Sequence, residues 1–411
     1  MELRPYQKEI VTRGLQIINQ YKFLYLAMEV RTGKTLTSLS IAQDIGGKGS
    51  VLFITKKKAI SSIEADYDLL NPNYHLHVIN YESLHKIPKN KWTVVICDEA
   101  HTMGAFPKPS KRAKQVKALL KKHNPFVILL SGTPTPESYS QIYHQIYGIP
   151  TNPFAQYKNF YRFSDDYVNV QVRPIGIMYI RDYSGGTKKI LEKIKPYTIS
   201  YTQKEAGFQV KTTEKILTVD MKEKTYEWIK KLQKDKVLRG TEEVVLGDTA
   251  VKLMSKVHQM YSGTVKFESG ATNVLDYSKA KFIKRKFENK KIAIFYKFIA
   301  ELDALKEVYG RESLTTNLEE FNTTDKSIAL QIVSGREGIS LKKASALIYY
   351  NIDFSATSYW QSRDRMTTKD RLKNKVYWIF ARKGIEHQIY KAVTKKKDYT
   401  LNHFKRDFLN L

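Results

Sequence analysis

The tripeptide Gly33-Lys34-Thr35 has the residue types and spacing of a loop that binds phosphate. It follows an apolar run and opens a segment with apolar residues on one helical face, which is the strand–loop–helix context that such loops require. Amides at the helix start would bind phosphate oxygens, Lys34 would reach the β- and γ-phosphates, and Thr35 would coordinate Mg²⁺. The full loop pattern has a glycine where Met28 stands, so the tripeptide alone leaves the assignment open.

The carboxylates Asp98 and Glu99 follow a second apolar run. Open parallel sheets bind ligands at the carboxyl ends of their strands, where this pair would lie. Asp98 can coordinate Mg²⁺ and Glu99 can polarise an attacking water, whereas a structural carboxylate pair would more often cap the next helix. Together with the upstream phosphate loop, the pair favours a site that hydrolyses a nucleotide.

Short apolar runs alternating with helix-like segments are expected to position these residues. The runs are too short for helices and nearly continuously apolar, as in strands buried on both faces. In the first part of the chain they cover residues 23–30, 50–55, 74–81, 92–100 and 125–133. Near the C-terminus they cover residues 291–298, 327–335, 345–354 and 376–383. This alternation predicts an α/β fold with two doubly wound parallel-sheet lobes.

The net charge of the 411-residue chain is +28, and 42% of its residues are hydrophobic. Such a composition provides for folded cores, and the charge favours a polyanion, nucleic acid above all, as partner. A solvated basic surface with no partner is the alternative. The single cysteine, Cys97, excludes an internal disulfide and a cysteine-built zinc site. Without a signal-like N-terminus or an apolar run of about 18 residues, no membrane association is expected.

Several motifs in the first lobe together resemble helicase superfamily two, and within it the Swi/Snf-type translocases on double-stranded DNA. "LRPYQ" at Leu3–Gln7 resembles the glutamine motif, and "LAMEVRTGKT" is similar to motif I. "VLFITKKK" resembles motif Ia, "VINYESL" the next strand-end motif, and "CDEAH" motif II. "LSGTP" at Leu130–Pro134 resembles motif III, which implies that Ser131 and Thr133 couple hydrolysis to lobe movement.

The resemblance continues through the second lobe in the family's order. "IAIFYKF" is similar to motif IV, Val333–Leu341 to motif V and Tyr359–Arg371 to motif VI. Two RecA-like lobes with ATP and Mg²⁺ in the cleft between them are therefore implied. Lys34, Glu99 and Arg365 are implied as catalytic residues, and Thr35 and Asp98 as ligands of Mg²⁺. The implied ATP-binding residues are Gln7 (to adenine), Arg31, Thr32, Gly33, Lys34, Thr35, Gly338, Gln361 and Arg365.

Each lobe is expected to carry an insertion. The first lobe would span residues 1–205, with an ATP-binding core at 1–148 and an aromatic and basic insertion at about 150–195. The second would span residues 206–411, with a helical insertion at about 221–262 and a core at about 276–411. The aromatic segment favours a small subdomain with a tyrosine-rich core over a platform that stacks on single strands.

The chain departs from the family pattern at two places. Arg31 replaces a glycine of motif I, so the first part of the loop is expected to keep an ordinary backbone, with its cation on phosphate or in solvent. In motif VI the second of two arginines falls on Thr368, which cannot supply a permanent positive charge. Arg365 is the first candidate for the cation that stabilises the transition state, and Arg363 and Arg371 are alternatives.

Residues that directly follow strands are expected to contact DNA phosphates without reading sequence. The candidates are Thr55, Lys56, Asn80, Tyr81, Lys297, Ser334 and Arg336. For single lysines a solvated surface position is equally consistent with the sequence, and Asn80 and Tyr81 could simply end a strand.

The resemblance implies an ATP-dependent translocase on duplex DNA, which we expect to be a cytoplasmic monomer. The small size and the composition rich in lysine, asparagine and tyrosine favour a bacterial or phage-infected cell as its source. Alternatives are a strand-separating or branch-migrating helicase, and a nucleic-acid-binding protein with a degenerate ATP site. RNA as the track is a further option, because "DEAH" also occurs in RNA helicases.

Overall fold

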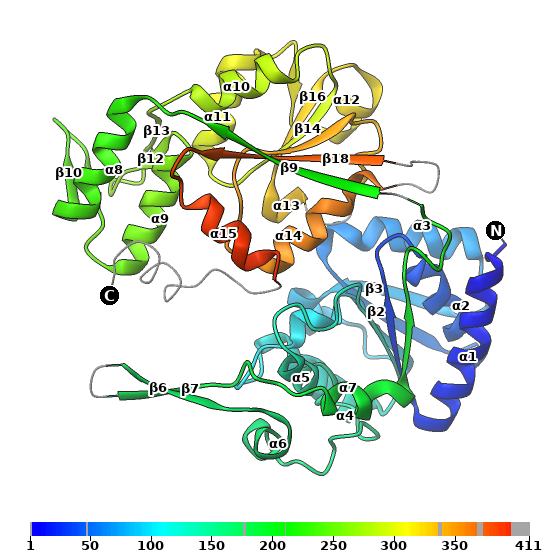
Figure 1. Cartoon of the computed structure of the whole chain (residues 1–411). Coiled ribbons are helices and arrows are strands. Elements are labelled where there is room, and N and C mark those ends of the chain that lie inside the picture. The colour runs from blue at the N-terminus through cyan, green and yellow to red at the C-terminus, as the bar shows by residue number, and fades with distance from the viewer. Residues whose placement is uncertain are drawn as a thin grey trace. The chain divides into compact units, whose positions relative to one another are not determined.

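A six-stranded parallel sheet forms the centre of each of two units, Met1–Phe208 and Gln209–Leu411, in the computed structural model (Figure 1). The structure describes residues 2–46, 48–175, 178–209, 211–335, 339–367 and 373–395. Each sheet has helices on both faces, as the near-continuously apolar strands predict. The predicted α/β fold class is confirmed.

The sheet of unit 1 has the strand order β3-β2-β4-β5-β1-β8. Its five predicted strands are present, whereas the edge strand β8 was not predicted, because its sequence TISY is short and half polar. The strands are β1 (Phe23–Met28), β2 (Ser50–Thr55), β3 (His75–Asn80), β4 (Trp92–Cys97), β5 (Phe126–Leu130) and β8 (Thr198–Tyr201).

Alternate residues of each strand in unit 1 face opposite helical layers. In β1, Leu24 and Leu26 pack with α1, α2 and α3, whereas Phe23 and Tyr25 pack with α4, α5, α6 and α7. The helices are α1 (Pro5–Tyr21), α2 (Lys34–Gly46), α3 (Ile60–Leu70), α4 (Lys111–His123), α5 (Ile142–Ile146), α6 (Phe160–Tyr167) and α7 (Lys189–Ile194). Short 3-10 turns cover Lys57–Ala59, Tyr81–Lys86, Ala100–Met103, Tyr139–Gln141 and Lys195–Tyr197.

The aromatic insertion contains α6 and a separate antiparallel hairpin of β6 (Gln171–Ile175) and β7 (Met178–Asp182). Phe154, Phe160, Phe163 and Tyr167 are buried and pack against one another. The expected aromatic core is therefore present around α6, but the hairpin extends beyond it (Figure 1).

The sheet of unit 2 has the strand order β15-β16-β14-β17-β18-β9. The four predicted strands are present, and β9 and β15 complete the edges. The strands are β9 (Lys211–Val219), β14 (Ile292–Tyr296), β15 (Leu314–Thr315), β16 (Ser327–Gln331), β17 (Ala346–Tyr349) and β18 (Lys373–Ala381).

Two helical layers also cover the sheet of unit 2. Ile294 and Ile348 pack with α10 and α11, whereas Phe295 and Tyr349 pack with α8, α9 and α15. The helices are α8 (Glu223–Asp235), α9 (Ala250–Tyr261), α10 (Ser278–Lys286), α11 (Ile299–Tyr309), α12 (Leu318–Thr323), α13 (Ile332–Gly335), α14 (Ala356–Arg363) and α15 (Glu386–Val393), with a 3-10 turn at Asp364–Met366. Two hairpins flank α9: β10 (Val237–Arg239) with β11 (Val244–Leu246), and β12 (Thr264–Lys266) with β13 (Thr272–Val274).

Candidate active site

The phosphate loop is the turn Glu29–Gly33 between β1 and α2. Thr32 is fully buried, and its hydroxyl donates to the Glu29 carbonyl at 2.7 Å. The Lys34 ammonium lies 3.4 Å from the same carbonyl oxygen. Lys34 and Thr35 begin α2, and the start of a helix is where backbone amides and the helix dipole favour a phosphate.

Arg31 has a left-handed backbone with a φ of 65°. The expectation of an ordinary backbone here was wrong: the loop keeps the conformation that a glycine would supply in the family pattern. A side chain in this region costs about 1–2 kcal/mol. Hydrogen bonds around the loop must offset that strain, since residue 31 itself does not favour the turn.

Gln7 of the glutamine motif holds the far end of this loop. Its side chain is buried; Nε2 donates to the Gly33 carbonyl at 3.3 Å, and Oε1 accepts from the Arg4 amide at 2.9 Å. The neighbouring Tyr6 hydroxyl donates to the Thr32 carbonyl at 3.1 Å. The opening motif thus fixes the phosphate loop, and reading of adenine by Gln7 stays a prediction.

Asp98 and Glu99 follow β4 at the same sheet edge as the phosphate loop. The Asp98 carboxylate accepts from the Thr55 hydroxyl at 2.8 Å, and the Asp98 carbonyl accepts from the Tyr81 hydroxyl at 2.6 Å. Burial, followed by the nearby charge of Glu99, raises the pKa of Asp98, while Lys34 acts in the opposite direction. Two adjacent carboxylates in a desolvated site are an arrangement that a divalent cation relieves.

A polar chain links Glu99 to motif III. The His101 Nδ1 atom lies 3.2 Å from Glu99 Oε2 and 3.0 Å from Ser131 Oγ. The Ser131 hydroxyl oxygen also accepts from the Thr133 amide at 3.1 Å. Glu99 has a φ of 49°, a strained conformation of the kind found at functional sites. Sequence reasoning missed His101, although it completes the "DEAH" tetrapeptide.

Thr55 and Tyr81 lie beneath Asp98 rather than at a DNA-facing surface. Both side chains are fully buried. The expectation that they contact DNA phosphates is therefore wrong, and both instead hydrogen-bond to Asp98. Their strand-end positions were correctly placed, but the side chains point inward. Lys56 and Asn80 are half-buried and stay candidates for DNA contact, with the Asn80 amide donating to Glu82 at 3.0 Å.

Lys297, the candidate DNA contact of motif IV, is held within unit 2. Its ammonium lies 2.8 Å from Asp353 and 3.8 Å from the centre of the Phe354 ring. The Ser358 hydroxyl of α14 donates to the other Asp353 oxygen at 2.7 Å. A DNA phosphate that bound Lys297 would have to displace Asp353. Because Asp353 also accepts from Ser358, this displacement would disturb the position of α14.

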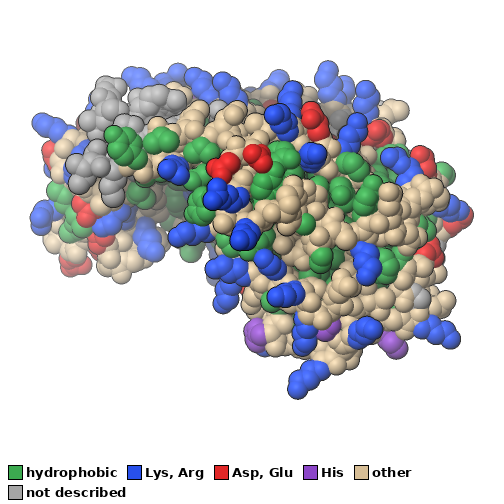
Figure 2. Space-filling model, turned by 90° about the horizontal axis from the view of Figure 1, so that it is seen from below, with side chains coloured by type: hydrophobic (Ala, Val, Ile, Leu, Met, Phe, Trp, Pro, Cys, Tyr) green, Lys and Arg blue, Asp and Glu red, His purple; other side chains and the backbone are tan. Residues whose placement is uncertain are grey.

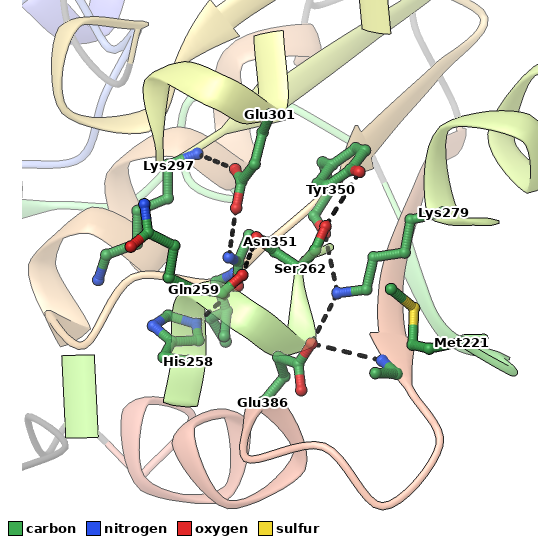
Figure 3. A network of polar contacts seen from close by, with 12 residues as sticks. Met221, His258, Gln259, Ser262, Lys279, Lys297, Glu301, Tyr350, Asn351 and Glu386 are labelled. Atoms are coloured by element: carbon green, nitrogen blue, oxygen red, sulfur yellow. Dashed lines mark hydrogen bonds and ion pairs between the residues drawn. The ribbon is translucent and has the colours of Figure 1, made fainter. Parts of the chain in front are cut away.

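A buried polar network lies behind Lys297 (Figure 3). The Asn351 side-chain nitrogen donates to Glu301 and its oxygen accepts from His258 Nε2, each at 2.6 Å. Glu301 also accepts from the Lys297 amide at 2.7 Å. Lys279 and Glu386, both fully buried, form an ion pair at 2.6 Å. These contacts connect α9, α10, α11, α15 and the end of β17.

Glu214 of β9 anchors the motif VI helix. Its carboxylate accepts from Tyr359 at 3.0 Å, Arg363 at 2.9 Å, Trp378 at 2.9 Å and Tyr390 at 3.2 Å. Arg363, an alternative for the transition-state cation, is therefore engaged in an ion pair inside unit 2. Arg365 is half-buried in the 3-10 turn after α14, and its carbonyl accepts from the Leu341 amide at 2.9 Å.

The remaining predicted positions of unit 2 lie outside the described part of the chain. Arg336, Gly338, Thr368 and Arg371 are outside the described residues, as are the side chains of Ser334 and Gln361.

The groups of unit 1 fit a nucleotide with Mg²⁺. The amides at the start of α2 and Lys34 would bind phosphates, and Thr35 and Asp98 would provide two oxygen ligands for Mg²⁺, with phosphates and waters completing an octahedral shell. Within the described residues, the buried Thr133 hydroxyl makes no hydrogen bond, so the site keeps a polar group without an internal partner.

Lysine and arginine side chains are scattered over the face shown in Figure 2, with fewer acidic groups among them. This distribution matches the +28 charge and marks no single strip as the nucleic-acid path. In the described residues, no helix combines the length and the apolar character needed to cross a bilayer.

Comparison with known proteins matches two overlapping parts of the chain to two families. Residues 45–264, a range that includes Asp98, Glu99 and Ser131, match the family described as SNF2-related domain. Residues 1–74, a range that includes Gln7 and Lys34, match the family described as type III restriction enzyme, res subunit. None of the curated proteins matches the chain.

Among solved structures, the chain is similar to the Sulfolobus solfataricus SWI2/SNF2 ATPase core in complex with dsDNA, with 14% identity and a TM-score of 0.42 over 96% of this chain and 91% of that one. A structure of the Sulfolobus solfataricus SWI2/SNF2 ATPase core domain is similar at 15% identity and a TM-score of 0.42, over 100% and 90% of the two chains. The SNF2-related match covers more than half of the 411 residues and confirms the resemblance drawn from the motifs. The chain belongs to the SNF2-related domain family.

Proposed function

We propose that this protein is an ATP-dependent translocase on double-stranded DNA. The observation that supports it most is the gathering of Lys34, Asp98 and Glu99 at one edge of the unit 1 sheet, with a polar chain from Glu99 to motif III. The net charge of +28 suits a polyanion such as double-stranded DNA as the ligand.

Each residue of this site has a distinct role in the proposal. ATP with Mg²⁺, bound by the phosphate loop, Thr35 and Asp98, supplies the bond that is hydrolysed. Lys34 offsets phosphate charge, and Glu99 orients and polarises the attacking water. His101 contacts both Glu99 and Ser131, so a change in the charge borne by Glu99 reaches motif III directly. Arg365 is assigned the transition-state cation.

Displacement of a third strand from a DNA triplex tests translocation, because a motor can remove that strand without separating the duplex. We expect ATP-dependent displacement by the wild type and none by Lys34→Ala. Lys48→Ala, at an exposed lysine outside the loop, serves as the matched control and should behave as the wild type. Failure of the wild type to displace the strand while hydrolysing ATP would contradict translocation.

Duplex binding should depend on phosphates rather than on sequence. The binding constant should fall steeply as salt rises, because each phosphate contact releases counterions, and should vary little between duplexes of different sequence. Fluorescence anisotropy over a salt series measures both properties, with single-stranded DNA and duplex RNA as competing tracks. An affinity independent of salt would exclude phosphate-driven binding.

The β6–β7 hairpin favours strand separation as a second candidate function. Its strands pair with no other strand in the described chain, and Val172, Tyr179 and Ile180 are 56%, 75% and 51% exposed. A two-stranded ribbon gains little stability by itself. Apolar residues that are exposed on such a ribbon therefore indicate a surface that binds a ligand. An aromatic ring such as Tyr179 can stack on an unpaired base.

Unwinding of a forked duplex separates the two functions. If the hairpin separates strands, Tyr179→Ser should lower fork unwinding while leaving triplex displacement and ATP turnover unchanged. Tyr161→Ser, at a second exposed tyrosine outside the hairpin, is the matched control. Absence of wild-type unwinding, with triplex displacement retained, would reject the second candidate and leave the first.

A further inference from the structure

The segment that connects the two units, residues 202–208, is hydrogen-bonded directly to the phosphate loop. We call this segment the connector. Gln203 makes both contacts: its amide donates to Glu29 Oε2 at 2.7 Å, and its side-chain Nε2 donates to the Val30 carbonyl at 3.0 Å. Just before it, the Tyr201 carbonyl accepts from the Glu29 amide at 2.9 Å and extends the β1–β8 ladder.

The connector is itself a closed turn. The Gln203 carbonyl accepts from the Phe208 amide at 2.9 Å, and Phe208 is the last residue of unit 1. The Glu205 carboxylate accepts from the amide and the hydroxyl of Thr202, both at 2.7 Å. Ala206 and Phe208 are buried. A displacement of Gln203 would therefore be passed to the point where unit 1 ends.

The loop residues that Gln203 holds are those whose bonding must change when phosphate binds. The Glu29 carbonyl accepts from the Thr32 hydroxyl and lies near the Lys34 ammonium. A phosphate would draw Lys34 away from this oxygen. Glu29 and Val30 also precede the strained Arg31, so a brace on them helps to keep the turn without a glycine.

We propose that Gln203 is a positioning residue for the phosphate loop and that it links nucleotide binding to the connector. The inference rests on the proposed nucleotide site, and it adds a residue outside the helicase motifs. Gln203 does not touch the reacting atoms. It holds the front of the loop through Glu29 and Val30, and the state of the loop sets the order of residues 202–208.

Hydrogen exchange of the full-length protein, followed by mass spectrometry, reads this link without requiring turnover. Adding ADP or a non-hydrolysable ATP analogue with Mg²⁺ should slow amide exchange in a peptide covering residues 202–208. Bound phosphate would hold Glu29–Gly33 in place. The hydrogen bond from the Gln203 amide to Glu29 would then break less often, which slows exchange of that amide. Gln203→Ala should lose most of this slowing and bind the analogue about three- to tenfold more weakly, as expected for one neutral hydrogen bond.

Matched variants separate positioning from general damage. Gln203→Glu keeps the size but replaces the donor with a carboxylate facing a carbonyl, so its effect should exceed that of Gln203→Ala. Glu29→Gln keeps a carbonyl acceptor for the Gln203 amide and should retain the slowing. Lys204→Ala, in the same turn and exposed, should match the wild type. Exchange across β1 and β5 reports whether each variant is folded.

The two possible failures are distinguishable. If the wild type binds the analogue but exchange in residues 202–208 is unchanged, or Gln203→Ala shows the same slowing and affinity as the wild type, the link is overturned and the nucleotide site stands. If the wild type binds neither nucleotide, the proposed function fails and this inference fails with it.

Discussion

The phosphate-loop site of unit 1 and the buried polar network of unit 2 both gather charged groups beyond the ends of strands, yet they pair them differently. In unit 2, Lys279 and Glu386 neutralise each other with no exposure, and Asn351 bridges His258 and Glu301. In unit 1, Asp98 lies beside a second carboxylate and its pKa is raised. The network of unit 2 pairs its buried acid with a buried base, whereas the site of unit 1 places two carboxylates next to each other.

This difference separates scaffold from site. Desolvated charges are costly unless paired, so a closed network fixes how helices attach to a sheet. Two adjacent carboxylates in a desolvated site repel each other, which costs stability that a bound cation would offset, and strain at Arg31 and Glu99 adds to that cost. The unit 1 groups are therefore expected to govern turnover, and the unit 2 groups to govern folding.

Removing the carboxylate from Glu99 should have the largest effect on turnover. Glu99→Gln should lower ATP hydrolysis by about 10³-fold or more, within the range for losing a positioned general base. Nucleotide and DNA binding should persist, because the amide retains the size of the side chain. Glu82→Gln, at an exposed carboxylate paired with Arg112, is the control. Wild-type turnover by Glu99→Gln would remove Glu99 from the role of base.

Breaking the buried pair of unit 2 should affect stability instead. Lys279→Met leaves Glu386 charged and unpaired in the interior, which should cost about 3–5 kcal/mol of unfolding free energy. Replacing both residues, as Lys279→Met with Glu386→Leu, should recover much of that loss. Urea unfolding monitored by circular dichroism measures both. If the single variant unfolds like the wild type, the pair does not stabilise unit 2.

Motif VI lies in unit 2, but we expect its residue Arg365 to affect turnover, as the unit 1 groups do, rather than folding. Arg365→Ala should lower turnover by about 10²-fold, the lower range for losing a transition-state cation, with nucleotide binding retained. Arg363→Ala should have a smaller effect and should not add to Glu214→Gln, because the two side chains form one ion pair. An additive double variant would give Arg363 a role beyond Glu214.

The smallest effect is expected beneath Asp98. Thr55→Val removes one hydroxyl that donates to the Asp98 carboxylate, which should lower turnover by about threefold to tenfold. Thr55→Ser keeps the hydroxyl and should remain near the wild type. DNA affinity measured by anisotropy should be equal in both variants, because the side chain is buried. A selective loss of DNA binding would restore the original assignment of Thr55 to the DNA surface.

The sequence was sufficient for the central strands of both sheets, because runs such as 50–55 are short and continuously apolar. The roles of Lys34, Thr35, Asp98 and Glu99 stay predictions that rest on what phosphate and Mg²⁺ require. The direction in which a side chain points could not be predicted from the sequence. Thr55 and Tyr81 were placed at strand ends, but only the fold shows that both point toward Asp98.

Long-range partners were also beyond the sequence. Glu214 and Gln203 belong to no motif, and their roles depend on contacts with residues 149 and 174 positions away, respectively. The left-handed backbone at Arg31 was mispredicted because local preference opposes it. Hydrogen bonds around the loop, from Gln7, Tyr6 and Gln203, override that preference.

ATP hydrolysis with and without duplex DNA tests the central claim most directly. The account predicts that the wild type hydrolyses ATP, that duplex DNA accelerates the reaction, and that Lys34→Ala abolishes it in both conditions. Acceleration is expected because a ligand that favours the hydrolytically competent state raises its population. Hydrolysis that no nucleic acid accelerates would contradict the translocase, and absence of hydrolysis would leave a nucleic-acid-binding protein with a degenerate ATP site.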